Sequence, residues 1–326
     1  MTSVQFARYE LIRKIAAGGQ AEVFLARQWG QADFFNDLVI KRLFRHLADD
    51  PRTLRLFQDE ARLMAELSHP SVPQVFELGL ADGHWYMAME YVPGFTLGEL
   101  QVAGTRAAQP MPLGVALGIA IQLCEGLHHG HERRDHASVP MRIVHRDVSP
   151  DNVMVTPDGV VKILDFGVAQ SSGRTTPDLG TVGTYAYMAP EQVRGLPLDK
   201  RADVFAIGVL LYELTTGCRA FTGSDVQVMT AIVERDPPPP SQLRADYPSD
   251  VEATVLAALA RNRQQRTSSA GQLALQLEQL AIRHSLLTGP RVVARHVRRM
   301  FPYEPVADRS VGFVSSAPWT DPRLRG

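Results

Sequence analysis

The chain has 326 residues, of which 45% are hydrophobic and 21% charged, and its formal net charge is -1. This composition predicts a folded protein with one large domain or two lobes, and the near-zero charge argues against broad nucleic-acid binding. No uncharged apolar stretch is long enough for a transmembrane helix, and the first residues lack an apolar signal core, so we expect a cytoplasmic protein. The two cysteines, Cys124 and Cys218, lie in apolar surroundings and are expected to be buried free thiols.

The first ninety residues predict a sheet with one helix. Apolar runs on either side of a glycine-rich turn indicate strands within residues 9–43. Residues 52–67 change to helical spacing, and the pair His69-Pro70 ends that helix. Two more strands are expected over residues 74–78 and 85–91, joined by a turn at Asp82-Gly83.

Beyond Pro93 the pattern becomes mainly helical. Helices are expected over residues 113–131, 204–216, 251–261 and 270–284. The second of these is apolar on nearly every side, which predicts full burial. A polar insert over 132–142 and a proline-rich loop over 234–248 interrupt the helices.

These elements predict an α+β fold with two lobes. Residues 1–92 form a small, strand-rich N-lobe and residues 93–285 a larger, mainly helical C-lobe. A short hinge near Glu90 to Pro93 joins them, and a cleft between lobes is a common place for a ligand. Residues 286–326 are expected to form a C-terminal helix and a loose tail.

Two short runs carry the chemistry. The first is His145-Arg146-Asp147-Val148-Ser149-Pro150-Asp151-Asn152, and the second is Asp165-Phe166-Gly167. Asp147 lies in a loop, where its carboxylate could take the proton of an attacking hydroxyl group. Asn152 and Asp165 offer the hard oxygen ligands that Mg²⁺ prefers. Together the runs supply the parts needed to transfer a phosphoryl group from ATP.

Two further features fit that chemistry. Lys41 follows an apolar strand, where a lysine makes sense if it holds phosphate oxygens and is itself fixed by Glu60 on the following helix. The turn containing Ala16, Gly18 and Gly19 has the small residues that let backbone N–H groups approach the phosphates.

The order and spacing of these runs resemble the protein kinase family over residues 9–285, and the bacterial serine/threonine kinases of the eukaryotic (Hanks) type in particular. The resemblance implies Lys41 on the α- and β-phosphates, Glu60 as its partner, Asp147 as the catalytic base, and Asn152 and Asp165 as Mg²⁺ ligands. It also implies an adenine site, which comprises a gatekeeper and hinge at Met89, Glu90 and Val92, covered from above by Val23 and Val39.

The resemblance extends to the C-lobe. Ala189-Pro190-Glu191 looks like the end of the activation segment, with Arg266 as the buried partner of Glu191, and Asp203 resembles the residue that holds the catalytic loop. Thr184 resembles the threonine that marks specificity for serine and threonine hydroxyl groups. Arg146 is expected to pair with a phosphate on the activation segment, which carries five candidate sites for autophosphorylation in a transient homodimer: Ser171, Ser172, Thr175, Thr176 and Thr181.

Some positions depart from the family pattern. Ser149 stands where a lysine that neutralises the transferred phosphate is usual. The two interpretations are a lowered but not abolished rate and another cation that reaches into the site. Ala16 and Ala21 replace two glycines of the phosphate loop, and Val39 replaces an alanine. We therefore expect an active protein kinase that uses ATP and Mg²⁺. The alternatives are a catalytically impaired ATP-binding scaffold and a small-molecule kinase, although the latter generally lacks the Ala-Pro-Glu segment.

The C-terminal region lies outside the resemblance. Arg291, Arg295, Arg298 and Arg299 flank apolar residues at helical spacing. The favoured interpretation is a helix that docks on the C-lobe, and the alternative is a basic amphipathic helix for a membrane surface or a partner.

Overall fold

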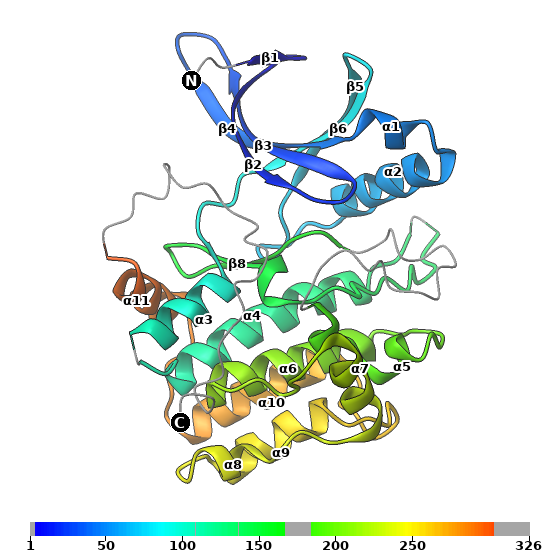
Figure 1. Cartoon of the computed structure of the whole chain (residues 1–326). Helices are drawn as coiled ribbons and strands as arrows, with labels where there is room; N and C mark the ends of the chain where they lie inside the picture. Colours follow the sequence, from blue (N-terminus) through cyan, green and yellow to red (C-terminus); the bar gives the residue numbers. More distant parts are fainter. Residues whose placement is uncertain (1–3, 108, 136, 167–183, 303–326) are drawn as a thin grey trace.

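The N-lobe is built on one antiparallel sheet. The structure, a computed structural model, describes residues 4–107, 109–135, 137–166 and 184–302. Six strands pair in the order β1-β2-β3-β4-β6-β5 (Figure 1). They are β1 (Val4–Phe6), β2 (Tyr9–Ala17), β3 (Ala21–Trp29), β4 (Phe35–Leu43), β5 (Val75–Ala81) and β6 (His84–Glu90). The predicted strands are confirmed, whereas the short β1 was not predicted.

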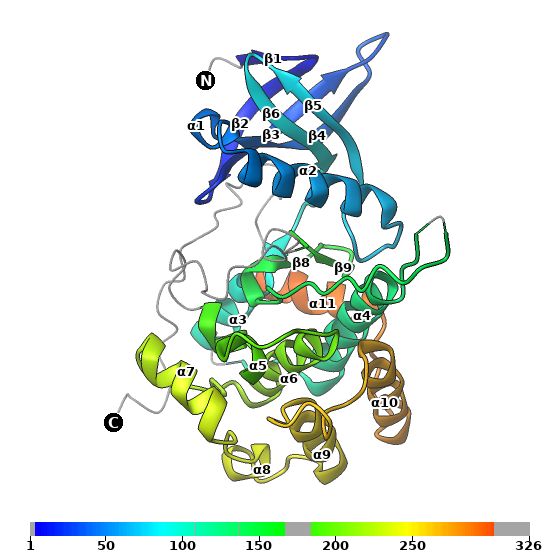
Figure 2. The same cartoon turned by 90° about the vertical axis from the view of Figure 1, so that its right-hand side faces the viewer.

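The predicted N-lobe helix is α2 (Pro51–Glu66), preceded by the single turn α1 (Arg45–Ala48). The Asp50 side chain accepts hydrogen bonds from the backbone N–H groups of Arg52 and Thr53, and Pro51 occupies the first helical position. The helix buries one apolar face, which includes Phe57 and Met64. Figure 2 shows α2 running across the lower edge of the sheet, so this face closes the core of the N-lobe.

The C-lobe is mainly helical, as predicted. Its central helix, α6 (Arg201–Thr216), has side chains buried along nearly its whole length, and it packs against α4 (Leu113–His131), α9 (Ser249–Ala258) and α10 (Ala270–Arg283). The helices of the described C-lobe are α3 (Leu97–Arg106), α4 (Leu113–His131), α5 (Pro190–Val193), α6 (Arg201–Thr216), α7 (Asp225–Glu234), α8 (Pro240–Leu243), α9 (Ser249–Ala258), α10 (Ala270–Arg283) and α11 (Pro290–Met300). The loop predicted over 234–248 was wrong in one part, because Pro240 begins the short α8 with its ring at the first helical position.

A second, smaller sheet lies at the upper face of the C-lobe, between the helices and the N-lobe (Figures 1 and 2). Its strands β7 (Phe95–Thr96), β8 (Val153–Val155) and β9 (Val161–Ile163) pair in that order. Asn152 immediately precedes β8 and Asp165 follows β9 by two residues, so this sheet places both at the boundary between the lobes.

The helix α11 docks on the C-lobe, as the favoured interpretation predicted. Val293 and Val297 are buried against α3 and α4, and the ring of Phe301 stacks on that of Phe95 with 3.7 Å between centroids. Among the described residues, no helix is both long and apolar enough to cross a membrane.

The expectation of two buried thiols was correct for Cys124 and wrong for Cys218. Cys218 is only half-buried because it directly follows Gly217, which ends α6 in the left-handed conformation and turns the chain toward the surface.

Candidate active site

Three charged side chains meet between the lobes. The Lys41 ammonium group on β4 lies 2.7 Å from Glu60 Oε1 on α2 and 2.9 Å from Asp165 Oδ1 after β9. Only 16% of the Lys41 side chain is exposed, so both contacts form in a water-poor site. Although burial opposes both charges, the attraction keeps Lys41 protonated and holds the pKa of Asp165 below its ordinary value. The predicted pair is therefore present, and Asp165 joins it.

The catalytic loop is held from below by Asp203 on α6. Its Oδ2 accepts hydrogen bonds from the backbone N–H group of His145 at 2.8 Å and from the ring Nε2 of His131 at 2.7 Å. Its Oδ1 accepts a hydrogen bond from the backbone N–H group of Arg146 at 2.8 Å. Arg146 has φ 70°, a conformation that costs about 1–3 kcal/mol in a residue with a side chain. The buried carboxylate offsets that strain, which explains why the loop needs an acid at this position.

Asp147 and Asn152 face each other across the loop. The Asn152 amide donates hydrogen bonds to the carbonyl oxygen of Asp147 at 2.9 Å and to its carboxylate Oδ2 at 2.8 Å. Burial raises the pKa of Asp147 to about 6, while the hydrogen bond from Asn152 acts in the opposite direction. A carboxylate with this pKa is ionised at neutral pH and is still basic enough to take a proton.

Phe166 anchors the segment that carries Asp165. Its side chain is 1% exposed and lies beside the His145 ring, with 4.8 Å between ring centroids. The His145 ring nitrogen Nε2 is 3.0 Å from the carbonyl oxygen of Leu164. These contacts connect the catalytic loop directly to the segment after β9 that contains Asp165. Gly167 and the five candidate phosphorylation sites lie outside the described residues.

An apolar cleft opens beside this charged cluster. The residues lining it come from both lobes and include the predicted hinge. They are Ile15, Val23, Val39, Lys41, Met89, Glu90, Tyr91, Val92, Met154, Leu164 and Asp165. The three predicted hinge residues and both predicted covering valines therefore line one cleft, together with Lys41 and Asp165 of the charged cluster. An apolar lining with a lysine and an aspartate beside it suits a flat heterocycle that carries a charged tail.

The glycine-rich turn lies between β2 and β3. Ala16 is buried, whereas Gly18 and Gly19 are exposed, and the Gly18 N–H group donates to the carbonyl oxygen of Ala21 at 2.9 Å. The turn thus has small, exposed residues at its tip. Whether it covers phosphate groups stays a prediction.

The donor set fits a divalent cation that binds together with phosphate groups. Asn152 gives its amide hydrogens to Asp147, which leaves Oδ1 as its ligand atom, and Asp165 supplies a carboxylate. In the described part of the chain, no group of three or more histidine, cysteine or acidic side chains could hold a metal alone. Two protein oxygens with phosphate and water are the usual environment of Mg²⁺.

Two other predicted site residues are Ser149, in the catalytic loop, and Thr184, before the Ala-Pro-Glu segment. Ser149 is 4% exposed, and its carbonyl oxygen accepts the Asn152 N–H group at the start of the turn that leads into β8. Within the residues described here, the hydrogen-bonded partner of the Asp147 carboxylate is the Asn152 amide and no cation contacts it. Thr184 begins a 3-10 turn that runs to Tyr187, and its side chain lies outside the described part.

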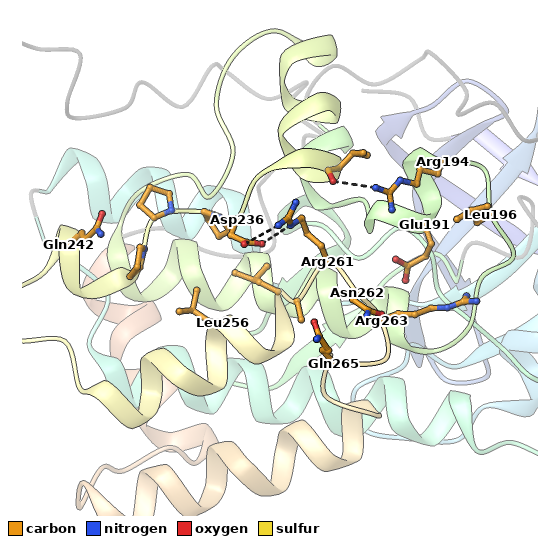
Figure 3. Close-up of a pocket in the computed structure, with 16 residues that line it drawn as sticks. Glu191, Arg194, Leu196, Asp236, Gln242, Leu256, Arg261, Asn262, Arg263 and Gln265 are labelled. Atoms are coloured by element: carbon orange, nitrogen blue, oxygen red, sulfur yellow. Dashed lines mark hydrogen bonds and ion pairs between the residues drawn. The ribbon is translucent and has the colours of Figure 1, made fainter.

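The ion pair predicted between Glu191 and Arg266 is present. Both side chains are buried, and the guanidinium group binds the two carboxylate oxygens at 2.7 and 3.0 Å. Glu191 also borders a cavity of about 1010 Å³ low in the C-lobe, where Arg261 pairs with Asp236 (Figure 3). Because Glu191 and Asp236 are both paired with arginines, this larger cavity offers neither carboxylate as a free base.

Sequence reasoning missed two contacts around the site. One is the hydrogen bond between His131 and Asp203, and the other is an ion pair between Lys162 and Glu90. Lys162 stands three residues before Asp165 on a strand whose neighbours are buried, so a charge in that position was the available signal.

Comparisons with known proteins agree with this geometry. The family described as protein kinase domain matches residues 9–277. The chain is 41% identical over 309 residues to the tyrosine-protein kinase MasK of Myxococcus xanthus, covering 94% of this chain and 48% of MasK. It is 37% identical over 274 residues to the serine/threonine-protein kinase PknB of Mycobacterium leprae, covering 82% of this chain and 42% of PknB. The chain thus spans less than half the length of these two curated relatives.

The solved structures include the PknI kinase domain of Mycobacterium tuberculosis. It matches with a TM-score of 0.62 and 26% identity, over 85% of this chain and 97% of that domain. The two-lobed arrangement described above is therefore a fold already observed by crystallography.

Proposed function

Because the chain belongs to the bacterial, Hanks-type branch of the protein kinase family, we propose that it transfers the γ-phosphoryl group of ATP to hydroxyl groups of protein substrates. The observation that carries the proposal is the convergence of Glu60 and Asp165 on Lys41, at 2.7 and 2.9 Å, where Lys41 and Asp165 also line an apolar cleft. Such a cluster places a fixed cation where the phosphates of a bound nucleotide would lie.

The residues divide the work as follows. The Asp147 carboxylate accepts the proton of the attacking hydroxyl group while that oxygen bonds to the γ-phosphorus, and the bond from the γ-phosphorus to the bridging oxygen breaks to release ADP. Lys41 holds the α- and β-phosphates and is oriented by Glu60. Asn152 orients Asp147 through its two hydrogen bonds.

Mg²⁺ is part of the proposal, and Asn152 and Asp165 would hold it. When bound, the ion supplies positive charge that neutralises the phosphate oxygens. The cleft wall made by Val23, Val39, Met89 and the hinge would hold the adenine ring through apolar contacts and backbone hydrogen bonds. ATP and reduced cysteines are both cytoplasmic, so a cytoplasmic location belongs to the same proposal.

For the acceptor we propose serine or threonine. The motif position of Thr184 and the similarity to the PknB serine/threonine-protein kinases support this choice, while the similarity to MasK, a tyrosine-protein kinase, supports tyrosine as a second candidate. Arg146 as the partner of a phosphorylated activation segment stays a prediction, as does autophosphorylation in a transient homodimer.

The test is an assay of phosphate transfer from labelled ATP to a mixed protein substrate, followed by phosphoamino-acid analysis. Asp147→Asn should lower the rate by about 10²–10⁴-fold, because the amide cannot accept the proton. Asp158→Asn, a change at an exposed carboxylate in the turn between β8 and β9, serves as the matched control. Equal rates for wild type and Asp147→Asn would contradict the proposal. Phosphotyrosine as the main product would show that the acceptor is tyrosine and not serine or threonine.

A further inference from the structure

Lys162 and Glu90 form an ion pair that joins the two lobes behind the cleft. The ammonium group of Lys162 on β9 lies 2.8 Å from both carboxylate oxygens of Glu90 at the end of β6. The Lys162 side chain is 12% exposed and that of Glu90 32%. Because β6 belongs to the six-stranded sheet and β9 to the three-stranded sheet, this contact connects the hinge to the strand that leads to Asp165.

Glu90 is also held by the segment that enters β5. Its N–H group donates to the carbonyl oxygen of Gln74 at 2.8 Å, and its Oε2 accepts the N–H group of Gln74 at 3.1 Å. The backbone and the side chain of Glu90 are therefore both fixed, the latter by Gln74 and Lys162 together. Since Glu90 lines the cleft, these contacts restrict the part of the hinge that faces a bound ligand.

We propose that Lys162 is a positioning residue for the adenine-binding hinge, an inference that rests on the proposed function. Hydrogen bonds to a flat heterocycle depend on backbone groups held within a few tenths of an ångström, so a hinge that is fixed before binding gains affinity. Glu90 lines the cleft and Lys162 does not, so we assign Lys162 no part in proton or phosphoryl transfer. Its contribution should therefore appear in nucleotide affinity and leave the chemical step unchanged.

Removing the ammonium group leaves the Glu90 carboxylate partly buried beside apolar strands without its cation. We expect this carboxylate to turn toward water and the hinge backbone to move with it. The Lys162→Met variant keeps much of the length and the apolar contacts of the side chain and removes the charge. It is thus the sharpest single change at this site.

The experiment measures ADP binding by titration calorimetry together with the KM for ATP and kcat. In Lys162→Met we expect the ADP Kd and the KM for ATP to rise by about 5- to 10-fold, with kcat at saturating ATP within about twofold of wild type. Lys162→Arg should bind ADP almost as well as wild type, because it restores the cation. Arg283→Met, which removes an exposed pair with Asp250 at the same 2.8 Å distance, is the control and should change none of these values.

A double variant tests whether the pair acts as a unit. Glu90→Gln should weaken ADP binding as Lys162→Met does, and the two changes together should cost no more than either alone. Equal ADP affinities of wild type and Lys162→Met would overturn the inference. A higher kcat/KM in Lys162→Met would also overturn it, because the pair would then restrain the enzyme. If Lys162→Arg bound ADP as weakly as Lys162→Met, the inference would likewise be overturned. Wild-type protein that binds no ADP would instead overturn the proposed function itself.

Discussion

At the scale of single residues, the site depends on how burial changes the charge of a carboxylate. Asp147 and Asp165 are both half-buried aspartates of the candidate active site, yet their pKa values shift in opposite directions. Asp165 has Lys41 beside it at 2.9 Å, whereas Asp147 is contacted by a neutral amide. The two carboxylates are therefore suited to different tasks: one stays ionised as a ligand and the other is basic enough to accept a proton.

The pKa of Asp147 predicts the acid side of the pH profile. The base must be ionised, and burial raises its pKa to about 6, so kcat/KM should rise with pH through about 6 and level off above it. The negative charge of Asp151 contributes to that raised pKa. Asp151→Asn should therefore move the acid limb to lower pH, as measured by initial rates between about pH 4.5 and 8. If the acid limb of the wild type lay at about pH 4, the ordinary pKa of an aspartate, this assignment would be contradicted.

Because Ser149 carries no positive charge, we expect kcat to be lower than it would be with a lysine at this position. In the described residues no cation contacts Asp147, so Ser149→Lys should raise kcat, with an upper limit of about 2–4 kcal/mol of transition-state stabilisation. Ser149→Met is the matched control because it has similar length without charge. Steady-state rates at saturating ATP compare them, and a Lys variant no faster than the Met variant would show that the missing charge is not limiting.

At the scale of elements, α6 organises the catalytic loop and the segment that ends at α5. Its Asp203 binds the backbone of His145 and Arg146, and the buried pair of Arg266 with Glu191 lies near its first turn, where Arg266 also donates to the Arg201 carbonyl oxygen. A helix apolar on all sides can be surrounded by protein, and the few acids it carries then become fixed anchors for loops.

The pair Arg266–Glu191 should be costly to break from one side. Arg266→Met leaves a buried carboxylate without its cation, and we expect a loss of about 3–5 kcal/mol in the free energy of unfolding. Arg283→Met removes an exposed pair and should cost less than about 1 kcal/mol. Urea denaturation measures both. Replacing Glu191 by Leu together with Arg266→Met should recover part of the loss, and equal costs for the two single variants would contradict the burial argument.

At the scale of the whole molecule, α11 belongs to the structure of the C-lobe. It lies beyond residues 9–277 that match the protein kinase domain, yet it packs on α3 and α4. The turn between β8 and β9 also meets it closely. Gly159 has φ +81°, and a Cβ atom there would overlap the carbonyl oxygen of Pro290 at the start of the helix. The C-terminal helix thus supports the small sheet that carries Asn152 and Asp165.

Gly159→Ala tests that contact against a matched glycine. Gly217 has a similar φ of +70° with no atom within 4 Å, so Gly217→Ala measures the conformational cost alone, about 1–2 kcal/mol. Gly159→Ala should lose about 1–3 kcal/mol more, because the added methyl group must displace α11. Chemical denaturation of the two variants gives the difference. Equal losses would mean that the turn and α11 are not packed together in solution.

Much of the fold and the composition of the site could be predicted from the sequence alone. Helical and strand periodicities depend on local spacing, so α2, α4, α6 and the N-lobe strands were predicted close to their observed bounds. Short elements such as β1 and α8 carry too few residues for a periodic signal. The chemistry of Asp147, Asn152 and Asp165 was also readable, because residue type and short spacing define it.

Only the tertiary structure decided which distant groups meet. Lys41 and Asp165 are 124 residues apart in the chain, and Lys162 and Glu90 are 72 apart. No local pattern determines such contacts, because they depend on how the two sheets and α2 pack around the cleft. The same packing sets the burial that raises the pKa of Asp147, and it places α11 against the C-lobe. The sequence by itself thus determined which groups are available for chemistry, and packing decided their partners and their charge.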